Sequence, residues 1–237
     1  MKFSKLINTL IQAIPEETGY SYGEQYGAYN CKDLKEVQKV LYCVTIGPEI
    51  EDYFLANGYD LLISHHPFNI PKNIPTLIFH TALDCCQGGL NDIWADILGI
   101  KNPKPIDKEI GRYGEIDPIS FKDLVEKIRN FPGDIIGETY STVDVIKSVA
   151  VCTGLGGLIN NKALQTGVDC YIIGENIVPA KQTGIPALIE VGHTLSERVG
   201  VIFFQKILPE IQVDVAPLDI DIFNEEVYRS RSYQRSK

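Results

Sequence analysis

The chain has 237 residues, of which 44% are hydrophobic and 22% are charged, and its net charge is −9. These values are typical of a globular protein with enough chain for one large domain or two closely associated ones, and the negative charge disfavours nucleic acid and anionic membranes as partners. No run approaches the roughly 18 apolar residues of a membrane span, and the N-terminus lacks a secretory signal. Six cysteines without Cys-x-x-Cys spacing predict a reduced, cytoplasmic protein. The basic tail, residues 229–237, is interpreted as a frayed end.

The first half of the chain predicts alternating helices and strands. The expected elements are a helix over residues 3–13, an irregular or hairpin region over 15–34, a strand over 39–45, a helix from Pro48, strands over 60–64 and 76–79, and a helix from Leu90 that ends before Gly99. Residues 101–118, which are rich in proline and glycine, are expected to form a loop.

The second half predicts a similar succession of elements. We expect a helix over residues 120–129 with Ser120 as its cap, a strand over 148–153, a helix over 157–166, a strand near 167–174, a helix from about Pro179, a strand over 187–191, a helix over 196–208 and a strand over 212–216.

The two halves also resemble each other in sequence. Residues 58–65, Gly-Tyr-Asp-Leu-Leu-Ile-Ser-His, are echoed by residues 167–174, Gly-Val-Asp-Cys-Tyr-Ile-Ile-Gly. We therefore predict an α/β fold of two pseudo-repeated lobes, residues 1–118 and 119–237, that face each other across a shared cleft. Chance similarity between two α/β segments is the alternative explanation.

The four histidines all fall at the expected strand ends. His65 and His66 end one strand, and His80 and His193 each follow another and precede a carboxylate by four residues, Asp84 and Glu197 respectively. On a helix, that spacing puts both side chains on one face. Adjacent residues of a strand point to opposite faces, so a His-His pair suits two neighbouring metals better than one. A plain pair of polar residues at a strand end is the structural alternative.

Two further residues are candidates for catalysis. His80 is either a core histidine, a partner of a metal ligand, or a ligand itself. Glu175 lies at a strand end that corresponds to that of His65 in the other half, where it could serve as a general base or contact the substrate, although a surface glutamate is an equally simple interpretation.

Four blocks of sequence together resemble the Nif-three-like dinuclear-metal family, whose members are often named GTP cyclohydrolase I type 2. The blocks are Leu62-Ile63-Ser64-His65-His66-Pro67, His80-Thr81-x-x-Asp84, Gly88-Gly89-x-Asn91-Asp92 and Gly192-His193-x-x-Ser196-Glu197. The resemblance implies a two-lobed α/β fold and two divalent ions, such as zinc, iron or manganese. It implies as their ligands His65, His66, Asp84, His193 and Glu197. It also implies a homo-oligomer, a hexamer built as a trimer of dimers.

The sequence also departs from the family pattern. Thr45 stands where an aspartate usually ends the first strand, and Gly174-Glu175-Asn176 replaces the usual Gly-Asp followed by a histidine. These changes leave the implied ligands intact and put the substrate in doubt. The resemblance implies a metal-dependent hydrolase acting on a small substrate such as a nucleotide. A non-catalytic metal-binding protein with a regulatory or interaction role is the alternative.

Overall fold

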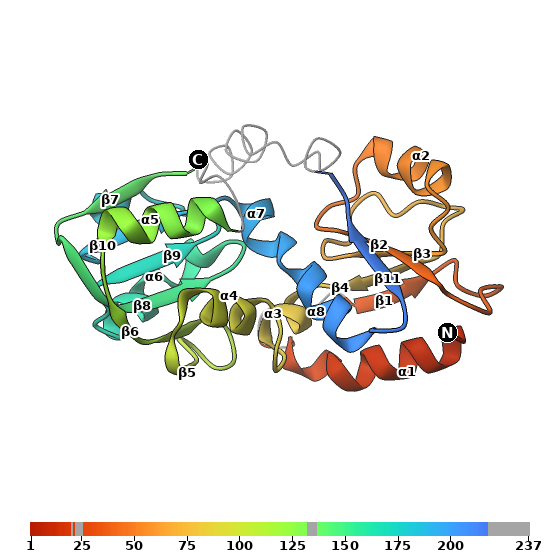
Figure 1. The fold of residues 1–237 in the computed structure, drawn as a ribbon, viewed down its shortest axis with the longest axis horizontal. Coiled ribbons are helices and arrows are strands. Elements are labelled where there is room, and N and C mark those ends of the chain that lie inside the picture. The colour runs from red at the N-terminus through yellow and green to blue at the C-terminus, as the bar shows by residue number, and fades with distance from the viewer. Residues whose placement is uncertain (20, 22–25, 132–136, 218–237) are drawn as a thin grey trace. The chain divides into compact units, whose positions relative to one another are not determined.

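The computed structural model describes residues 1–19, 21, 26–131 and 137–217, and the basic tail at 229–237 lies outside them. The chain divides into two compact units (Figure 1). Unit 1 comprises Met1–Gly89 and the segment from Gly200 onwards, and unit 2 comprises Leu90–Val199.

Unit 1 is built around a five-stranded sheet with the strand order β1-β4-β3-β2-β11. Its elements are α1 (Phe3–Ala13), a 3-10 helix (Glu16–Thr18), β1 (Tyr26–Tyr29), β2 (Lys39–Cys43), α2 (Pro48–Ala56), β3 (Leu61–Ser64), β4 (Thr76–Phe79), α3 (Thr81–Cys85), α8 (Gly200–Ile207) and β11 (Gln212–Val215). Strands β11, β2, β3 and β4 run parallel, and β1 pairs antiparallel with the edge of β4. The apolar spacing that predicts the first helix gives α1, with Leu6 and Leu10 buried.

Unit 2 is built around a six-stranded sheet with the strand order β5-β6-β8-β9-β10-β7. Its elements are α4 (Leu90–Leu98), β5 (Lys101–Lys104), β6 (Arg112–Ser120), α5 (Phe121–Asn130), β7 (Thr139–Ser141), β8 (Val145–Cys152), a 3-10 helix (Gly156–Ile159), α6 (Asn160–Gln165), β9 (Cys170–Ile173), a 3-10 helix (Ala180–Gln182), β10 (Ala187–Glu190) and α7 (His193–Arg198). Strands β8, β9 and β10 are parallel, and β5, β6 and β7 add antiparallel edges. Ser120 caps α5, since its hydroxyl accepts a hydrogen bond from the Asp123 N–H at 3.1 Å.

The sequence repeat is a structural repeat, in which β2, β3 and β4 of unit 1 correspond to β8, β9 and β10 of unit 2. In both units, an aspartate directly before the middle one of these three strands accepts hydrogen bonds from backbone N–H groups of the first one. Asp60 accepts hydrogen bonds from the backbone N–H groups of Gln38 and Lys39 at 2.8 and 2.9 Å. Asp169 accepts them from Lys147 and Ser148 at 2.8 and 3.0 Å. The predicted α/β fold of two repeated units is therefore confirmed.

The two cores repeat as well. In unit 1, Leu41, Cys43, Tyr59 and Leu62 belong to one buried cluster beneath α2. In unit 2, the buried cluster contains Ala150, Cys152, Val168 and Tyr171, which occupy the same places in the repeated strands and the same spacing along the chain. Because both faces of a parallel strand are covered, the central strand of each unit is apolar, from Leu61 to Ile63 in β3 and from Cys170 to Ile173 in β9, and β3 reaches its first polar residue, Ser64, at its carboxyl end.

Some elements differ from those that the sequence predicts. Residues 101–118 contain the strands β5 and β6 instead of a loop. Proline is tolerated there because β5 is an edge strand, and the pairing of β6 with β8 is irregular between Glu115 and Ile119, which spans Pro118. Only a 3-10 turn follows Pro179, and the helix expected over residues 196–208 is two helices, α7 and α8.

The division of the chain also differs from the expected boundary at residues 118 and 119. That boundary falls inside β6, a strand of unit 2, whereas α8 and β11 return to unit 1. The reason is that β11 pairs with β2, more than 150 residues earlier, from Gln212 opposite Lys39 to Val215 opposite Tyr42. Local periodicity identifies a strand but carries no information about so distant a partner.

Two further expectations can be compared with the structure. Among the described residues, no helix has the length and apolar character needed to cross a bilayer. All six cysteines lie in the described part of the chain, and none of them is disulfide-bonded.

Candidate metal centre

The turn that follows β3 presents His65 and His66. The backbone N–H of His65 donates to the Cys43 carbonyl at 3.1 Å, and that of His66 donates to the Val44 carbonyl at 2.8 Å, so both residues still follow the neighbouring strand β2. The Ser64 hydroxyl donates to the His66 carbonyl at 2.8 Å and closes the turn. Both histidines are buried. The sequence therefore places two imidazoles at the carboxyl edge of a parallel sheet, where binding sites of α/β folds commonly lie.

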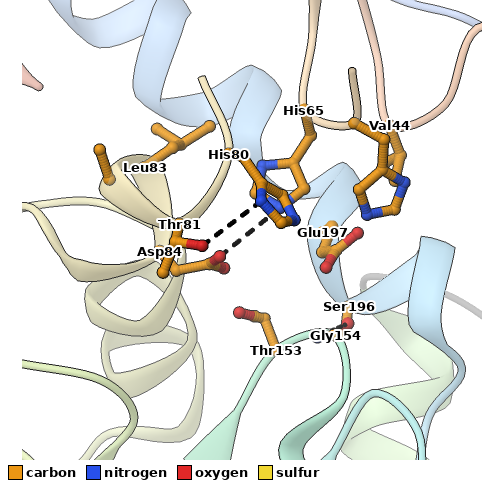
Figure 2. Close-up of polar contacts among 12 residues, drawn as sticks. Val44, His65, His80, Thr81, Leu83, Asp84, Thr153, Gly154, Ser196 and Glu197 are labelled. Carbon is orange, nitrogen blue, oxygen red and sulfur yellow. Dashed lines mark hydrogen bonds and ion pairs between the residues drawn. The ribbon is translucent and has the colours of Figure 1, made fainter. Parts of the chain in front are cut away.

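A third imidazole joins this pair within unit 1. Ligand nitrogens of His65, His66 and His80 all lie within 4.8 Å of one another. The ring centroids of His65 and His66 are 5.1 Å apart, and those of His65 and His80 are 5.0 Å apart. The Asp84 carboxylate, on α3, lies 3.5 Å from Nε2 of His65 (Figure 2). Three imidazoles and a carboxylate form a donor set that suits zinc, iron and related ions.

Two threonines adjoin these histidines. The Thr45 hydroxyl lies 2.6 Å from Nδ1 of His66. The Thr81 hydroxyl lies 3.4 Å from Nδ1 of His80 (Figure 2). When the Nδ1 edge of His66 faces Thr45, its Nε2 edge is the one presented to a ligand. The sequence marked Thr45 only as a departure from the family pattern, and its contact with His66 was not predicted.

Unit 2 presents a second cluster of candidate ligands beyond the carboxyl end of β10, the strand that corresponds to β4 of unit 1. On α7, Nε2 of His193 lies 3.2 Å from the Glu197 carboxylate, as the spacing of four residues predicts. On the other edge of the ring, Nδ1 of His193 lies 3.0 Å from the Glu175 carboxylate. Burial by itself would lower the pKa of His193, but the Glu197 and Glu175 carboxylates outweigh it and raise that pKa to about 10. The two carboxylates therefore favour the protonated form of the His193 ring.

The structural repeat shows that Glu175 corresponds to His66, and not to His65 as the sequence suggested. The His65 N–H donates to the Cys43 carbonyl, and the Gly174 N–H donates to the corresponding Cys152 carbonyl at 3.1 Å. Gly174 therefore matches His65, and Glu175 matches His66. At this position unit 2 has a carboxylate where unit 1 has an imidazole.

A network of hydrogen bonds fixes the start of α7. The Ser196 hydroxyl donates to the His193 carbonyl at 2.6 Å and accepts from the Gly154 N–H at 3.0 Å (Figure 2). The Trp94 indole Nε1 of α4 donates to the Ser196 carbonyl at 2.7 Å. Asn91, one turn earlier on α4, accepts from the Thr153 N–H at 3.1 Å through its side chain. These contacts give a structural role to Asn91 and Ser196, two residues of the sequence motifs that are not among the predicted ligands.

Gly154→Ala is expected to disturb the Glu197 carboxylate. A Cβ at residue 154 would lie 2.4 Å from Oε1 of Glu197, and the φ of +56° adds backbone strain of roughly 1 kcal/mol. We expect an overall loss of about 2 kcal/mol or more in the free energy of unfolding, measured by urea denaturation. Gly167→Ala is the matched control, because Gly167 has a similar φ of +71° and no atom within 4 Å of its added Cβ. Equal losses in the two variants would show that Glu197 has room to move aside.

The structure thus arranges the sequence-predicted residues in two groups. His65, His66, His80 and Asp84 come together in unit 1, and His193, Glu197 and Glu175 come together in unit 2. His80 is the N-cap residue of α3, directly before the first helical residue, and Asp84 on α3 contacts His65 of the neighbouring turn. Each group offers nitrogen and oxygen donors, and both fit a borderline divalent ion.

The chain is similar in sequence and in fold to known proteins. A family model described as Duf34/NIF3 (NGG1p interacting factor 3) matches residues 68–225. A GTP cyclohydrolase 1 type 2 homolog of Methanothermobacter thermautotrophicus is 29% identical over 197 residues, which cover 73% of this chain and 81% of that protein. A protein of the same name from Methanocaldococcus jannaschii is 25% identical over 251 residues, covering 92% of this chain and 100% of its own. The crystal structure of a Bacillus cereus protein related to NIF3 superimposes with a TM-score of 0.77 at 16% identity, covering 94% of this chain and 98% of that one.

Proposed function

The chain belongs to the DUF34/NIF3 family, and from this premise we propose that it is a hydrolase that uses two divalent metal ions on a small nucleotide or related substrate. The observation that supports the proposal most directly is the cluster of His65, His66 and His80 beside Asp84, all within unit 1. The names of the curated relatives, GTP cyclohydrolase 1 type 2 homolog, supply the proposed reaction class.

The proposed ligands are the five residues that the sequence motifs single out: His65, His66, Asp84, His193 and Glu197. A pair of divalent ions would lower the pKa of a water molecule and polarise the bond to be hydrolysed. His66 would use its Nε2 edge, since Thr45 adjoins its Nδ1 edge at 2.6 Å. Asp84 and Glu197 are buried carboxylates, and carboxylates of this kind bind one ion or bridge two.

His80 completes the proposed machinery as the group that moves a proton. It is less buried than His65 and His66, and its ring lies 5.0 Å from that of His65 and 5.5 Å from that of His66. An imidazole can both accept and donate a proton, which suits this role. A role for His80 as an additional ligand is the competing assignment.

The proposal extends to the compartment, the oligomeric state and the size of the substrate. We propose a cytoplasmic protein, in keeping with its six cysteines and the absence of disulfides among them. We also propose a homohexamer, which the sequence resemblance implies. The net charge of −9 disfavours large polyanions and favours a small molecule as substrate.

The test is turnover of GTP by the metal-loaded protein. The protein would be purified, freed of metal with a chelator, reloaded with zinc, iron or manganese, and assayed for formate release from GTP and for hydrolysis of a panel of phosphoesters. We expect turnover that requires added metal and falls at least 100-fold in Asp84→Asn. Asp52→Asn, which changes an exposed carboxylate of the same unit, is expected to retain full turnover.

The outcomes separate the two functional classes. Two tightly held metal ions without turnover of any compound in the panel would contradict the hydrolase proposal and favour the non-catalytic, metal-binding alternative. Turnover that survives complete removal of metal would contradict both.

A further inference from the structure

The side chain of Glu175, a candidate catalytic residue, makes a specific contact with His193. Its carboxylate lies 3.0 Å from Nδ1 of His193, and the residue is only 6% exposed. Its backbone is fixed on both sides, because the Glu175 N–H donates to the Gly154 carbonyl at 2.7 Å and its carbonyl accepts from the Gly157 N–H at 3.0 Å. The backbone of Glu175 is therefore held by hydrogen bonds, and its carboxylate is held by the contact with His193.

The two edges of the His193 ring face different carboxylates. Nδ1 meets Glu175, whereas Nε2 meets Glu197 at 3.2 Å. The two ring nitrogens direct their bonds away from each other, so a group held at Nδ1 lies on the far side of the ring from an ion bound at Nε2. A carboxylate in that position cannot also reach a water molecule beside the ion. This geometry argues against Glu175 as a general base.

Resting on the proposed metal centre, we infer that Glu175 is a positioning residue, which holds the Nδ1–H of His193 so that Nε2 faces the metal. In metal sites, a carboxylate that accepts this second hydrogen bond fixes the ring and its tautomer, and makes the imidazole a more electron-rich ligand. The inference follows from contacts within unit 2 alone.

In unit 1, the Nδ1 edge of one proposed ligand, His66, faces a different kind of group. Nδ1 of His66 adjoins the Thr45 hydroxyl at 2.6 Å, which can orient the ring but carries no charge. Glu175 occupies the repeated position of His66 and supplies a carboxylate to His193. The two units therefore differ: a neutral hydroxyl, that of Thr45, orients His66, whereas a carboxylate, that of Glu175, orients His193. We expect His193 to depend on its partner more strongly than His66 depends on Thr45.

The experiment compares three variants of Glu175 in the full chain, with zinc as the probe. Zinc affinity would be measured by competition with a chromophoric chelator. We expect Glu175→Ala to weaken binding 10- to 100-fold, Glu175→Gln to weaken it less because the amide oxygen still accepts a hydrogen bond, and Glu175→Asp to fall closest to wild type if the shorter carboxylate reaches the ring. Asp169→Asn is the matched control, since it alters a carboxylate that accepts hydrogen bonds from Lys147 and Ser148 at the opposite end of β9. Its zinc affinity is expected to equal that of wild type.

A second measurement distinguishes positioning from general support of the fold. The chain has four histidines, so the ring nitrogens of the zinc-loaded protein can be assigned by ¹⁵N NMR. In wild type, His193 should show a slowly exchanging proton on Nδ1 and zinc on Nε2. In Glu175→Gln, that Nδ1 proton should exchange faster and its resonance should move, while the other histidines keep their signals.

Each outcome supports or overturns the inference. Wild-type zinc affinity in Glu175→Ala and Glu175→Gln would overturn it, and if turnover is lost at the same time, Glu175 is a general base after all. An unchanged His193 Nδ1 signal in Glu175→Gln would also overturn it, whatever happens to the affinity. A wild-type protein that fails to bind zinc would instead contradict the metal centre itself, which is a failure of the proposed function.

Discussion

His66→Ala is expected to abolish tight binding of zinc. His66 is buried, its ring belongs to the three-imidazole cluster of unit 1, and Thr45 orients it from the Nδ1 edge. The substitution removes one of the three imidazoles that this cluster offers to an ion, so we expect zinc affinity to fall at least 100-fold. The measurement is competition with a chromophoric chelator, together with metal content by elemental analysis.

Thermodynamic linkage gives an independent readout of the same variant. A ligand at one hundred times its dissociation constant raises the free energy of unfolding by about 2.7 kcal/mol, provided it does not bind the unfolded chain. Wild-type protein should show a stabilisation of this order with zinc, and His66→Ala should show almost none at the same zinc concentration. Thr45→Val keeps all the imidazoles and is expected to weaken binding by less than tenfold. Zinc-dependent stabilisation of His66→Ala equal to that of wild type would remove His66 from the ligand set.

The parts of the fold that the sequence predicted well are those with a strong local signal. The helix over residues 3–13 and the strand over residues 76–79 occur with the expected bounds, because apolar spacing fixes both. Ser120 caps α5 as expected, because the N-cap preference depends only on neighbouring backbone groups. The repeat was visible in the sequence because residues 58–65 resemble residues 167–174, and the structure shows that Asp60 and Asp169 of these segments make the same backbone contacts.

Features that depend on distant partners could not be predicted. β11 reads locally as a strand of the second half, yet it pairs with β2 of the first unit. β5 and β6 contain proline and glycine, which indicate a loop unless an edge position is known in advance.

The same limit applied to the candidate site. The motifs identified the histidines and their carboxylates, and the spacing from His193 to Glu197 predicted the contact on α7. The partners that orient them were not predictable, because Thr45 is 21 residues from His66 and Glu175 is 18 residues from His193. Polar residues at the carboxyl ends of parallel strands were the available signal, and they point to an edge of the sheet without saying which residues meet there.

Trp94→Ala is expected to be the most destabilising single substitution in unit 2. Trp94 is the only tryptophan of the chain, and it is completely buried. Truncating a buried aromatic side chain to alanine costs about 3–5 kcal/mol in the free energy of unfolding. The substitution also removes the indole N–H that donates to the Ser196 carbonyl at 2.7 Å. Far-UV circular dichroism along a urea titration measures the effect without relying on tryptophan fluorescence.

Trp94→Phe separates the packing contribution from the hydrogen bond. Phenylalanine keeps much of the apolar area but leaves the Ser196 carbonyl without its indole donor, so we expect a loss of about 1–3 kcal/mol. Because Ser196 lies between His193 and Glu197 on α7, the same variant is expected to weaken zinc binding by several-fold, whereas Phe54→Leu in the core of unit 1 should lower stability without that effect. Unchanged zinc affinity in Trp94→Phe would mean that α7 holds its two side chains in place without the indole hydrogen bond. The Ser196 hydroxyl, which joins the His193 carbonyl to the Gly154 N–H, would then be the sufficient anchor of that helix.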